Sequence, residues 1–520
     1  MNAQPLPPRG PAWRTRWPTL LGLTALLGVA LAVRLVWLES DPIWYDEAAT
    51  IGIAAMDWQV ILGAMAEAES SPPGYYIAAK LWSALHDDSI WWLRMLSVLA
   101  GVGAIVPVFV LARAYLGGVV PWVAGAFIAL AGTHVRLSQD ARCYALLFLV
   151  TAVAMLAAAR LATAVQRGER GLPAAIGLGV LMGLGLWLHA TAGLIVVSLN
   201  LFVLVLLGRP WTDLRRALVP LVVANLVMLM IAAAPLLAIL EQIDTDTPYG
   251  DRWILAPGLL DVVRLYGRAL VAPFLGDLSV LALGVHLMLL ASALLAWWRR
   301  RDAMIVALAA MLAGSALLLP LVSQFRPILL DRTVLFMLLP LALLLAAGVA
   351  NLPRRAMVPA VAVLLLFQAI GVAGWHSVPV RKEAWDQAAK LLQARMVAGE
   401  PIVLADSSFV SISLSRQLAR IGATVPRMVV VAPASHLEQL AAEHVMPNGR
   451  ADAAGLCRRL GGDVGTLWLV LRDHPVTVAA DNDFTSRHAV RAALAAGGGT
   501  LLAILKVPAV ELEHWTAPKC

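Results

Sequence analysis

Charge is scarce in this sequence. Only 14% of its 520 residues are charged and 60% are hydrophobic, whereas charged residues make up about a quarter of an ordinary soluble domain. A chain of this composition is expected to have the lipid bilayer as its main solvent. The formal net charge of the chain is +7. In a membrane protein, surplus basic residues usually set the orientation of the helices or contact lipid headgroups. No nucleic-acid partner is expected.

Cysteine is rare as well. The three cysteines, Cys143, Cys457 and Cys520, are far apart and show no CxxC spacing, which excludes the patterns of a disulfide framework and of a zinc module. The C-terminal region contains no GxGxxG or Walker spacing, so a soluble nucleotide donor has no support.

Long apolar runs are abundant instead. Stretches of about twenty residues, enough for a helix to cross a bilayer, recur along the chain and predict about eleven transmembrane helices. They lie near residues 20–38, 90–112, 119–134, 143–163, 172–188, 191–208, 217–240, 277–298, 303–322, 333–350 and 357–374. The sequence therefore predicts a polytopic α-helical membrane protein.

The arginines indicate the orientation of these helices. Many of them fall in alternate loops, at positions 9, 14, 16, 113, 160, 167, 170, 209, 215, 216, 299, 300, 301, 354 and 355. Because Lys and Arg are retained in cytoplasmic loops, the amino terminus is expected inside, and an odd number of crossings puts the C-terminal segment outside. We expect a multi-pass cell (inner) membrane protein with its polar chemistry on the extracytoplasmic face.

Two segments outside the membrane stand out. The first outer loop, residues 39–89, contains amphipathic stretches at 54–65 and 75–85 that are typical of helices lying on a membrane. After residue 375 the pattern changes to short β-like runs at 401–404, 428–431, 466–471 and 501–505, with helical patterns at 411–420 and 488–496. We therefore predict a transmembrane domain, 1–375, followed by an extracytoplasmic α/β domain, 376–520.

Three polar motifs lie at the predicted outer helix ends. Residues 44–47, Trp-Tyr-Asp-Glu, place two adjacent carboxylates just beyond the first membrane helix, where they are either solvated loop acids or a general base for an acceptor hydroxyl. Residues 69–76, Glu-Ser-Ser-Pro-Pro-Gly-Tyr-Tyr, combine a stiff turn with a helix start. Residues 138–144, Ser-Gln-Asp-Ala-Arg-Cys-Tyr, bring a guanidinium close to a carboxylate; such an arginine snorkels, pairs with an acid or binds a lipid phosphate.

In this order, the three motifs resemble those of the GT-C membrane glycosyltransferases, in particular the family of protein O-mannosyltransferases and lipid A aminoarabinose transferases. The resemblance covers the membrane part from about Arg34 to Arg332. It implies that the family's catalytic aspartate is Asp46, with Glu47 at the second position of the Asp-Glu motif. Two further segments are similar to family motifs: 186–191 around His189 and 326–333 with Arg326 and Arg332.

The resemblance implies a reaction and a set of site residues. The reaction is the inverting transfer of a monosaccharide from a polyprenyl-phosphate carrier to a hydroxyl, or another nucleophile, of a lipid, polysaccharide or protein on the outer face of the membrane. Asp46 and Glu47 are the catalytic candidates, and Arg142, Arg332 and Arg326 are the candidates for the donor phosphate. The expected substrate-binding residues are Glu69, Ser71, Tyr75, Tyr76, Gln139, Asp140, Tyr144 and His189.

Other interpretations stay open at this point. No certain cofactor is expected; a divalent cation is left open, with Glu69 as its candidate ligand, because one acid beside a serine does not specify a metal site. A lipid-linked sugar transporter or flippase would also carry intramembrane arginines and prolines, but internal repeats are not evident in the sequence. A noncatalytic sugar or lipid sensor would share the fold.

Overall fold

The chain forms two compact units. A computed structural model describes residues 17–63, 72–87, 89–208, 211–244, 254–378, 382–405, 407–431, 450–451, 455–460, 464–472 and 487–518. The first unit, called the bundle unit below, comprises Met1–Leu38, Arg94–Leu237 and Ile254–Val378. The second, called the sheet unit, comprises Glu39–Leu93, Ala238–Trp253 and Pro379–Cys520. The two units are thus interleaved along the sequence.

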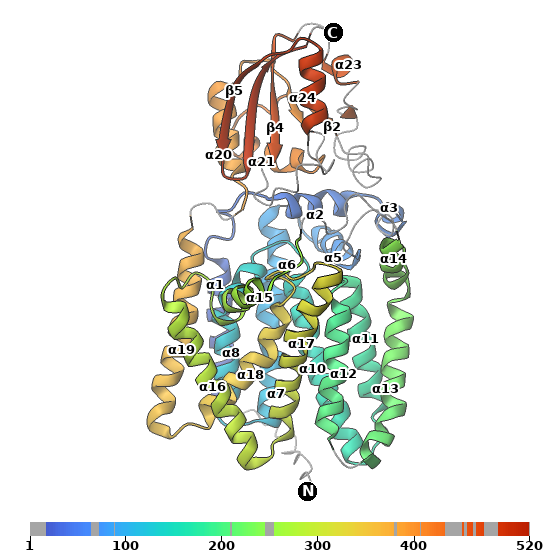
Figure 1. Ribbon diagram of the computed structural model, residues 1–520, viewed down its shortest axis with the longest axis vertical. Coiled ribbons are helices and arrows are strands. Elements are labelled where there is room, and N and C mark those ends of the chain that lie inside the picture. Colours follow the sequence, from blue (N-terminus) through green and yellow to red (C-terminus); the bar gives the residue numbers. More distant parts are fainter. Residues whose placement is uncertain are drawn as a thin grey trace. The chain divides into compact units, whose positions relative to one another are not determined.

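The bundle unit is helical (Figure 1). Without water to bind its backbone groups, a chain in lipid satisfies them within helices. Its elements, some reaching into the sheet unit, are α1 (Trp17–Leu35), α6 (Ile90–Gly103), α7 (Ile105–Tyr115), α8 (Val120–Leu130), α9 (Gly132–Ser138), α10 (Tyr144–Gln166), α11 (Leu172–Leu188), α12 (Ala192–Leu207), α13 (Trp211–Ile231), α14 (Ala233–Asp244), α15 (Leu259–Tyr266), η1 (Gly267–Val271), α16 (Leu278–Arg300), α17 (Ala303–Phe325), η2 (Leu335–Met337), α18 (Leu338–Ala350) and α19 (Arg354–Ser377).

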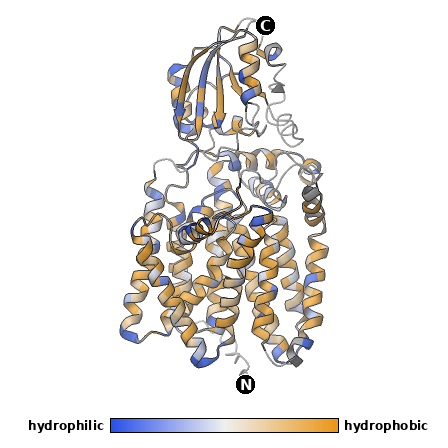
Figure 2. Ribbon diagram, viewed as in Figure 1, coloured by the Kyte–Doolittle hydropathy of each residue, from blue (hydrophilic) through white to orange (hydrophobic). Residues whose placement is uncertain are grey.

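The bundle helices are apolar along most of their length, with hydrophilic residues at their ends (Figure 2). Within the described residues, six helices are long and apolar enough to cross a membrane, or up to eight spans if each of two bent pairs is one span. Three shorter apolar helices, Leu172–Leu188, Ala192–Leu207 and Leu335–Ala350, add to them. Every apolar stretch predicted above coincides with one of these helices or pairs. The polytopic helical fold is confirmed, and the number of crossings stays a prediction.

Small residues allow close contacts between bundle helices. A Cβ atom on Gly179 of α11 would overlap the carbonyl oxygen of Ala224 on α13, and one on Gly348 of α18 would overlap that of Leu289 on α16. Membrane helices attract one another by packing rather than by the hydrophobic effect, so such close approach stabilises the bundle.

A buried arginine supports the bend between α8 and α9. These helices meet at an angle of 57°, which interrupts the helical hydrogen bonds at the bend. Arg34 of α1, with no exposed surface, donates from Nη1 to the carbonyl oxygen of Ala129 at 3.0 Å and from Nη2 to that of Ile128 at 3.3 Å. Nη2 also lies 2.9 Å from Nδ1 of His134 on α9. Arg34 thereby fixes the helix that leads into the segment 139–144.

The sheet unit contains a six-stranded sheet in the order β3-β2-β1-β4-β6-β5. Strand β1 pairs in parallel with β2 and β4, and β2 pairs in parallel with β3, whereas β6 is antiparallel to both β4 and β5. The strands are β1 (Ile402–Leu404), β2 (Met428–Val431), β3 (Arg450–Ala451), β4 (Thr466–Arg472), β5 (Leu501–Val507) and β6 (Val510–Thr516). Four of them match the predicted β-like runs.

Helices cover both faces of this sheet. One core joins β1, β2 and β4 to α20 (Trp385–Arg395) and α21 (Val410–Arg420). The other joins the opposite side chains of these strands to α23 (Leu456–Leu460) and α24 (Arg487–Ala496). This arrangement confirms the predicted α/β fold of the C-terminal region. The sheet unit also includes α2 (Tyr45–Ala55), α3 (Trp58–Gly63) and α5 (Gly74–Ser83) from the predicted first outer loop.

Candidate functional site

The Asp-Glu motif lies in the first turn of α2. Asp46 is partly buried, whereas Glu47 is fully buried. Amide N–H groups are unsatisfied in the first turn of a helix, and the helix dipole is positive there, so carboxylates are favoured at this place. The side chain of Trp44, the residue that precedes the helix, does not supply a capping acceptor. The local sequence thus places two acids where their charge is stabilised by backbone groups.

The second motif begins α5, which packs against α2. Tyr75 and Tyr76 in its first turn are both buried. Nζ of Lys80 on α5 donates to the carbonyl oxygens of Ala54 and Met56 at 3.0 and 2.7 Å, which ties α5 to the end of α2. The sheet unit therefore brings Asp46, Glu47 and the two tyrosines onto neighbouring helices. The predicted residues Glu69 and Ser71 lie outside the described residues.

The third motif links α9 to α10 in the bundle unit. The side-chain amide of Gln139 donates from Nε2 to the carbonyl oxygens of Arg34 and Val36, each at 2.9 Å. Its Oε1 accepts from Nε1 of Trp375 on α19 at 3.0 Å. Gln139 therefore joins the end of α1 to α19, which is a structural role that its motif did not indicate. Its proposed contact with substrate stays a prediction.

The next residues of this motif are also enclosed. Asp140 and Arg142 are both buried, at 5% and 7% exposure. The hydroxyl of Ser97 on α6 donates to the backbone carbonyl of Arg142 at 3.1 Å, which anchors this segment to α6. A buried guanidinium requires anionic or carbonyl acceptors around it.

A second guanidinium lies beside an aromatic pair. Cζ of Arg332 is 5.8 Å from the centroid of the Tyr144 ring, and the Tyr144 ring is 5.9 Å from that of His189. Arg332 and Tyr144 also line a pocket whose other walls are Leu147, Phe148, Thr191, Thr333, Leu335 and Phe336. The pocket thus has a cation at an otherwise largely apolar surface.

His189 is a neutral member of this cluster. Its Nδ1 accepts a hydrogen bond from the backbone N–H of Thr191 at 3.1 Å, so the proton of the neutral ring is on Nε2. Burial, followed by the positive charges of Arg332 and Arg142, lowers the pKa of His189 to about 3. At neutral pH the ring therefore offers an N–H donor without adding a third full charge.

The loop that carries Arg332 is held in place by its neighbours. Asp331 forms an ion pair with Arg136 of α9. Burial opposes ionisation of Asp331, but the charges of Arg136 and Arg332 and their hydrogen bonds outweigh it and keep the pKa below its usual value. The hydroxyl of Thr333 donates within the loop to the carbonyl oxygen of Ile328 at 2.9 Å. Arg326 ends α17 at the start of this loop.

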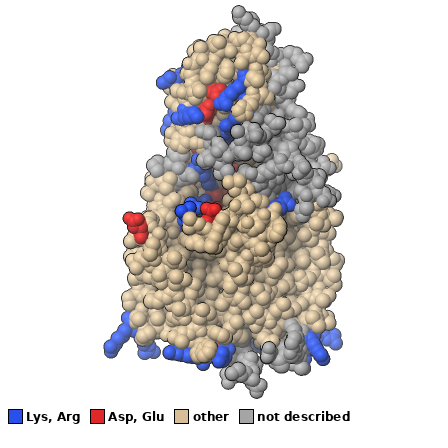
Figure 3. Space-filling view, in the orientation of Figure 1, with Lys and Arg blue, Asp and Glu red and all other residues tan. Residues whose placement is uncertain are grey.

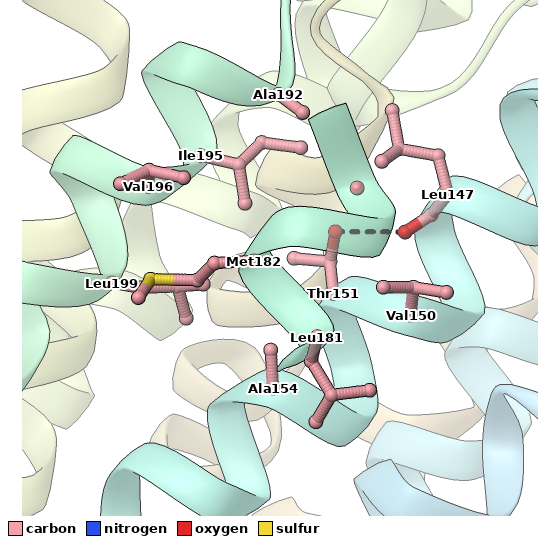
Figure 4. A pocket seen from close by; sticks show the side chains of 11 residues that line it. Leu147, Val150, Thr151, Ala154, Leu181, Met182, Ala192, Ile195, Val196 and Leu199 are labelled. Carbon is pink, nitrogen blue, oxygen red and sulfur yellow. Dashed lines mark hydrogen bonds between the residues drawn. The ribbon is translucent and has the colours of Figure 1, made fainter. Parts of the chain in front are cut away.

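A second cavity in the bundle unit has no comparable chemistry. It lies between α10, α11 and α12 and is lined almost entirely by aliphatic side chains (Figure 4). Its single hydroxyl, that of Thr151, donates to the carbonyl oxygen of Leu147 at 2.7 Å. This cavity therefore offers no charged group to a ligand. Within the part of the chain that the structure describes, no group of three or more His, Cys, Asp or Glu residues could hold a metal ion.

The predicted residues thus fall into two sets, one in each unit. The bundle unit brings together Tyr144, His189, Arg332 and the charge of Arg142. The sheet unit brings together Asp46, Glu47, Tyr75 and Tyr76. Sequence reasoning missed Arg34 as a support of the first set, although an arginine within the first apolar helix was a visible signal.

The fold is similar to that of several solved structures. The apo structure of ArnT from Cupriavidus metallidurans is similar over 96% of this chain and 98% of its own, with a TM-score of 0.61 and 14% sequence identity. ArnT bound to undecaprenyl phosphate gives the same coverage and identity, with a TM-score of 0.60. The archaeal oligosaccharyltransferase AglB from Archaeoglobus fulgidus, in complex with an inhibitory peptide and a dolichol-phosphate, covers 91% of this chain and 72% of its own, with a TM-score of 0.52 and 12% identity.

No protein-family model matches the chain, and no curated protein matches its sequence. At the low identities of the solved structures the likeness concerns the fold, and it confirms the GT-C resemblance at that level.

Proposed function

We propose that this protein is an inverting glycosyltransferase that takes a monosaccharide from a polyprenyl-phosphate carrier and transfers it to a hydroxyl of a lipid, polysaccharide or protein. The observation that carries this proposal is the Arg332 pocket, in a fold shared over 96% of the chain with a protein solved with undecaprenyl phosphate. The pocket combines a cation with apolar walls, which are the two features that a polyprenyl phosphate requires.

In the proposed reaction the bundle unit binds the leaving phosphate. The bond between the anomeric carbon and the phosphate oxygen breaks, and negative charge grows on the phosphate. Arg332 and Arg142 stabilise this charge because guanidinium groups bind phosphate oxygens through two parallel N–H donors. The Nε2–H of His189 is a further donor, and Arg326 is the third proposed cation.

The sheet unit supplies the proposed base. The acceptor hydroxyl attacks the anomeric carbon, and Asp46 takes its proton as the new carbon–oxygen bond forms. The first turn of α2 supports this role because a negatively charged side chain is favoured at the N-terminus of a helix. The remaining candidates are proposed to orient the sugar or the acceptor: Glu47, Glu69, Ser71, Tyr75, Tyr76, Gln139, Asp140 and Tyr144. Glu69 stays the candidate ligand for a divalent cation.

We further propose that the pocket end of the bundle faces away from the cytoplasm. Lys and Arg gather at one end of the bundle unit (Figure 3). Exposed arginines there include Arg299 and Arg300 at the end of α16 and Arg354 and Arg355 at the start of α19. Cytoplasmic loops are enriched in such residues. Arg332 comes after the C-terminal end of α17, and His189 comes directly after the C-terminal end of α11. Both helices begin next to the arginine-rich loops, so we place Arg332 and His189 on the extracytoplasmic side, as we do the proposed domain 376–520.

A cysteine introduced in the C-terminal α/β region tests this orientation. We expect it to react with a membrane-impermeant maleimide in intact spheroplasts. Labelling that occurs only after the membrane is permeabilised would reject the orientation, and with it the extracytoplasmic active site.

The function is tested with undecaprenyl-phosphate monosaccharides labelled in the sugar and reconstituted with the purified protein in liposomes. We expect label to move from the carrier to a lipid, polysaccharide or protein acceptor supplied from a membrane extract. Carrier that crosses the bilayer with its sugar still attached identifies a flippase instead. Carrier that binds without either event identifies a sensor.

A further inference from the structure

The first turn of α2 is held by residues from the C-terminal α/β region. Oε2 of Glu383, which is 7% exposed, accepts the backbone N–H of Tyr45 at 2.9 Å. The same oxygen accepts Nε1 of Trp385 at 2.7 Å. Nε of Arg472, at the end of β4, lies 3.8 Å from the other carboxylate oxygen. Glu383 therefore supplies the acceptor that the start of α2 lacks in its own sequence.

The side chains before Asp46 are held as well. Cζ of Arg472 lies 4.0 Å from the centroid of the Tyr45 ring, and the Tyr45 ring meets Phe409 edge to face at 6.3 Å. Nζ of Lys382 lies 3.9 Å from the centroid of the Trp44 ring. Contacts from three separate segments of the α/β region thus converge on the two residues that precede Asp46.

These contacts restrict the proposed base. Tyr45 and Asp46 are consecutive residues of one helical turn, so a fixed N–H direction at Tyr45 fixes the backbone from which the Asp46 side chain extends. The carboxylates also influence each other: burial raises the pKa of Glu383, Arg472 opposes this rise, and the negative charge of Asp46 adds to it. Glu383 accepts a hydrogen bond from the indole of Trp385 in its own segment and a second one from the Tyr45 amide of α2, so its role is not limited to binding Trp385.

We propose that Glu383, with Arg472, is a positioning residue for the Asp46 carboxylate, so that turnover depends on a contact made by the α/β region. This inference rests on the proposed function of Asp46 as the base. It gives the α/β region a part in catalysis through the first turn of α2. A small misplacement of a catalytic group is costly, so loss of this contact is expected to lower kcat rather than donor binding.

Glu400 provides a matched control in the same α/β region. It is 6% exposed, and its Oε2 also accepts one backbone N–H, that of Val397 at 2.8 Å, and one indole, Nε1 of Trp468 at 2.9 Å. Its hydrogen bonds to described residues stay within the α/β region, and none reaches α2. Glu400→Ala therefore reports the general cost of removing a buried carboxylate from the α/β region.

The test compares Glu383→Ala, Glu383→Gln and Glu400→Ala in the full chain. Hydrogen–deuterium exchange of the peptide spanning 42–56 is measured first. We expect exchange at Tyr45 to be at least about tenfold faster in Glu383→Ala because its amide loses a charged acceptor, and unchanged in Glu400→Ala. In the transfer assay kcat should fall roughly ten- to hundredfold at unchanged donor KM. Glu383→Gln, which keeps an acceptor oxygen, should recover part of both effects.

Two results would overturn the inference: wild-type exchange at Tyr45 in Glu383→Ala, or faster exchange with unchanged kcat. If Glu383→Ala does not fold, Arg472→Gln tests the same contact from the other side, and wild-type exchange with wild-type kcat in that variant counts against the inference. A wild-type protein that transfers no sugar rejects the glycosyltransferase proposal alone, and the exchange comparison then decides whether Glu383 holds α2.

Discussion

Replacing Asp46 with Asn should lower the rate of sugar transfer by roughly two to four orders of magnitude, the usual contribution of a general base. The amide is nearly isosteric with the carboxylate but is a far poorer proton acceptor. Asp46 is partly buried in the first turn of α2, where an amide also fits, so the fold and carrier binding should be largely kept. Single-turnover transfer of labelled sugar at saturating donor measures the chemical step.

Glu47→Gln is the internal control for this result. Glu47 is fully buried, so its replacement should act mainly on thermal stability and should reduce transfer less than Asp46→Asn does. Near-normal transfer by a well-folded Asp46→Asn variant contradicts the assignment. A larger loss of transfer in Glu47→Gln would move the base to Glu47.

Replacing Arg332 with Lys should weaken the binding of undecaprenyl phosphate by roughly ten- to a hundredfold, as expected when hydrogen bonds to a charged group are lost. Lysine keeps the positive charge but lacks the planar fork that binds two phosphate oxygens at once. Arg332 lines the pocket and lies against Tyr144, so the geometry of its donors is constrained before the ligand arrives. Titration followed by native mass spectrometry measures the change, and Arg142→Lys should give a loss of the same kind.

Arg301→Lys is the matched control for the Arg332 variant. Arg301 also lies against aromatic rings, with its Cζ 5.7 Å from the Trp297 ring and 5.0 Å from the Trp298 ring. It follows α16, outside the pocket that contains Arg332. Undecaprenyl phosphate should bind this variant as it binds the wild type. Unchanged binding in both Arg332→Lys and Arg142→Lys would remove the phosphate assignment.

Much of the fold was predictable because its causes are local. The apolar stretches predicted helices at the right places, since a segment of about twenty apolar residues in lipid has no alternative to a helix. The buried runs at 402–404, 428–431 and 466–472 were recognisable as strands because they are continuous and apolar. Strand β6 and helix α20 were missed, although Val510–Thr516 begins with the alternation of a half-buried strand and Trp385–Arg395 carries apolar residues at helical spacing.

The candidate site was predictable only as a set of motifs. Asp46, Arg142, His189 and Arg332 were identified by residue type at predicted helix ends and by the GT-C resemblance. That Tyr144, His189 and Arg332 are neighbours could not be read from the chain, because α10, α11 and the loop after α17 are distant in sequence. Arg34 and Glu383 were missed for a similar reason, since the groups that they bind are created by the fold.

The sequence alone determined that the lipid bilayer surrounds much of the chain, that this part is helical, and that the C-terminal region is an α/β fold. It also determined which types of residue are available for chemistry. These follow from composition and short-range periodicity, which act within one turn or one strand. Only the tertiary structure decided which polar groups meet. The hydrogen bond between Glu383 and Tyr45 spans 338 positions, and Arg34 reaches carbonyl groups about a hundred positions away at a bend in another helix. Such partners depend on where packing brings separate helices together, and packing is a property of the whole chain.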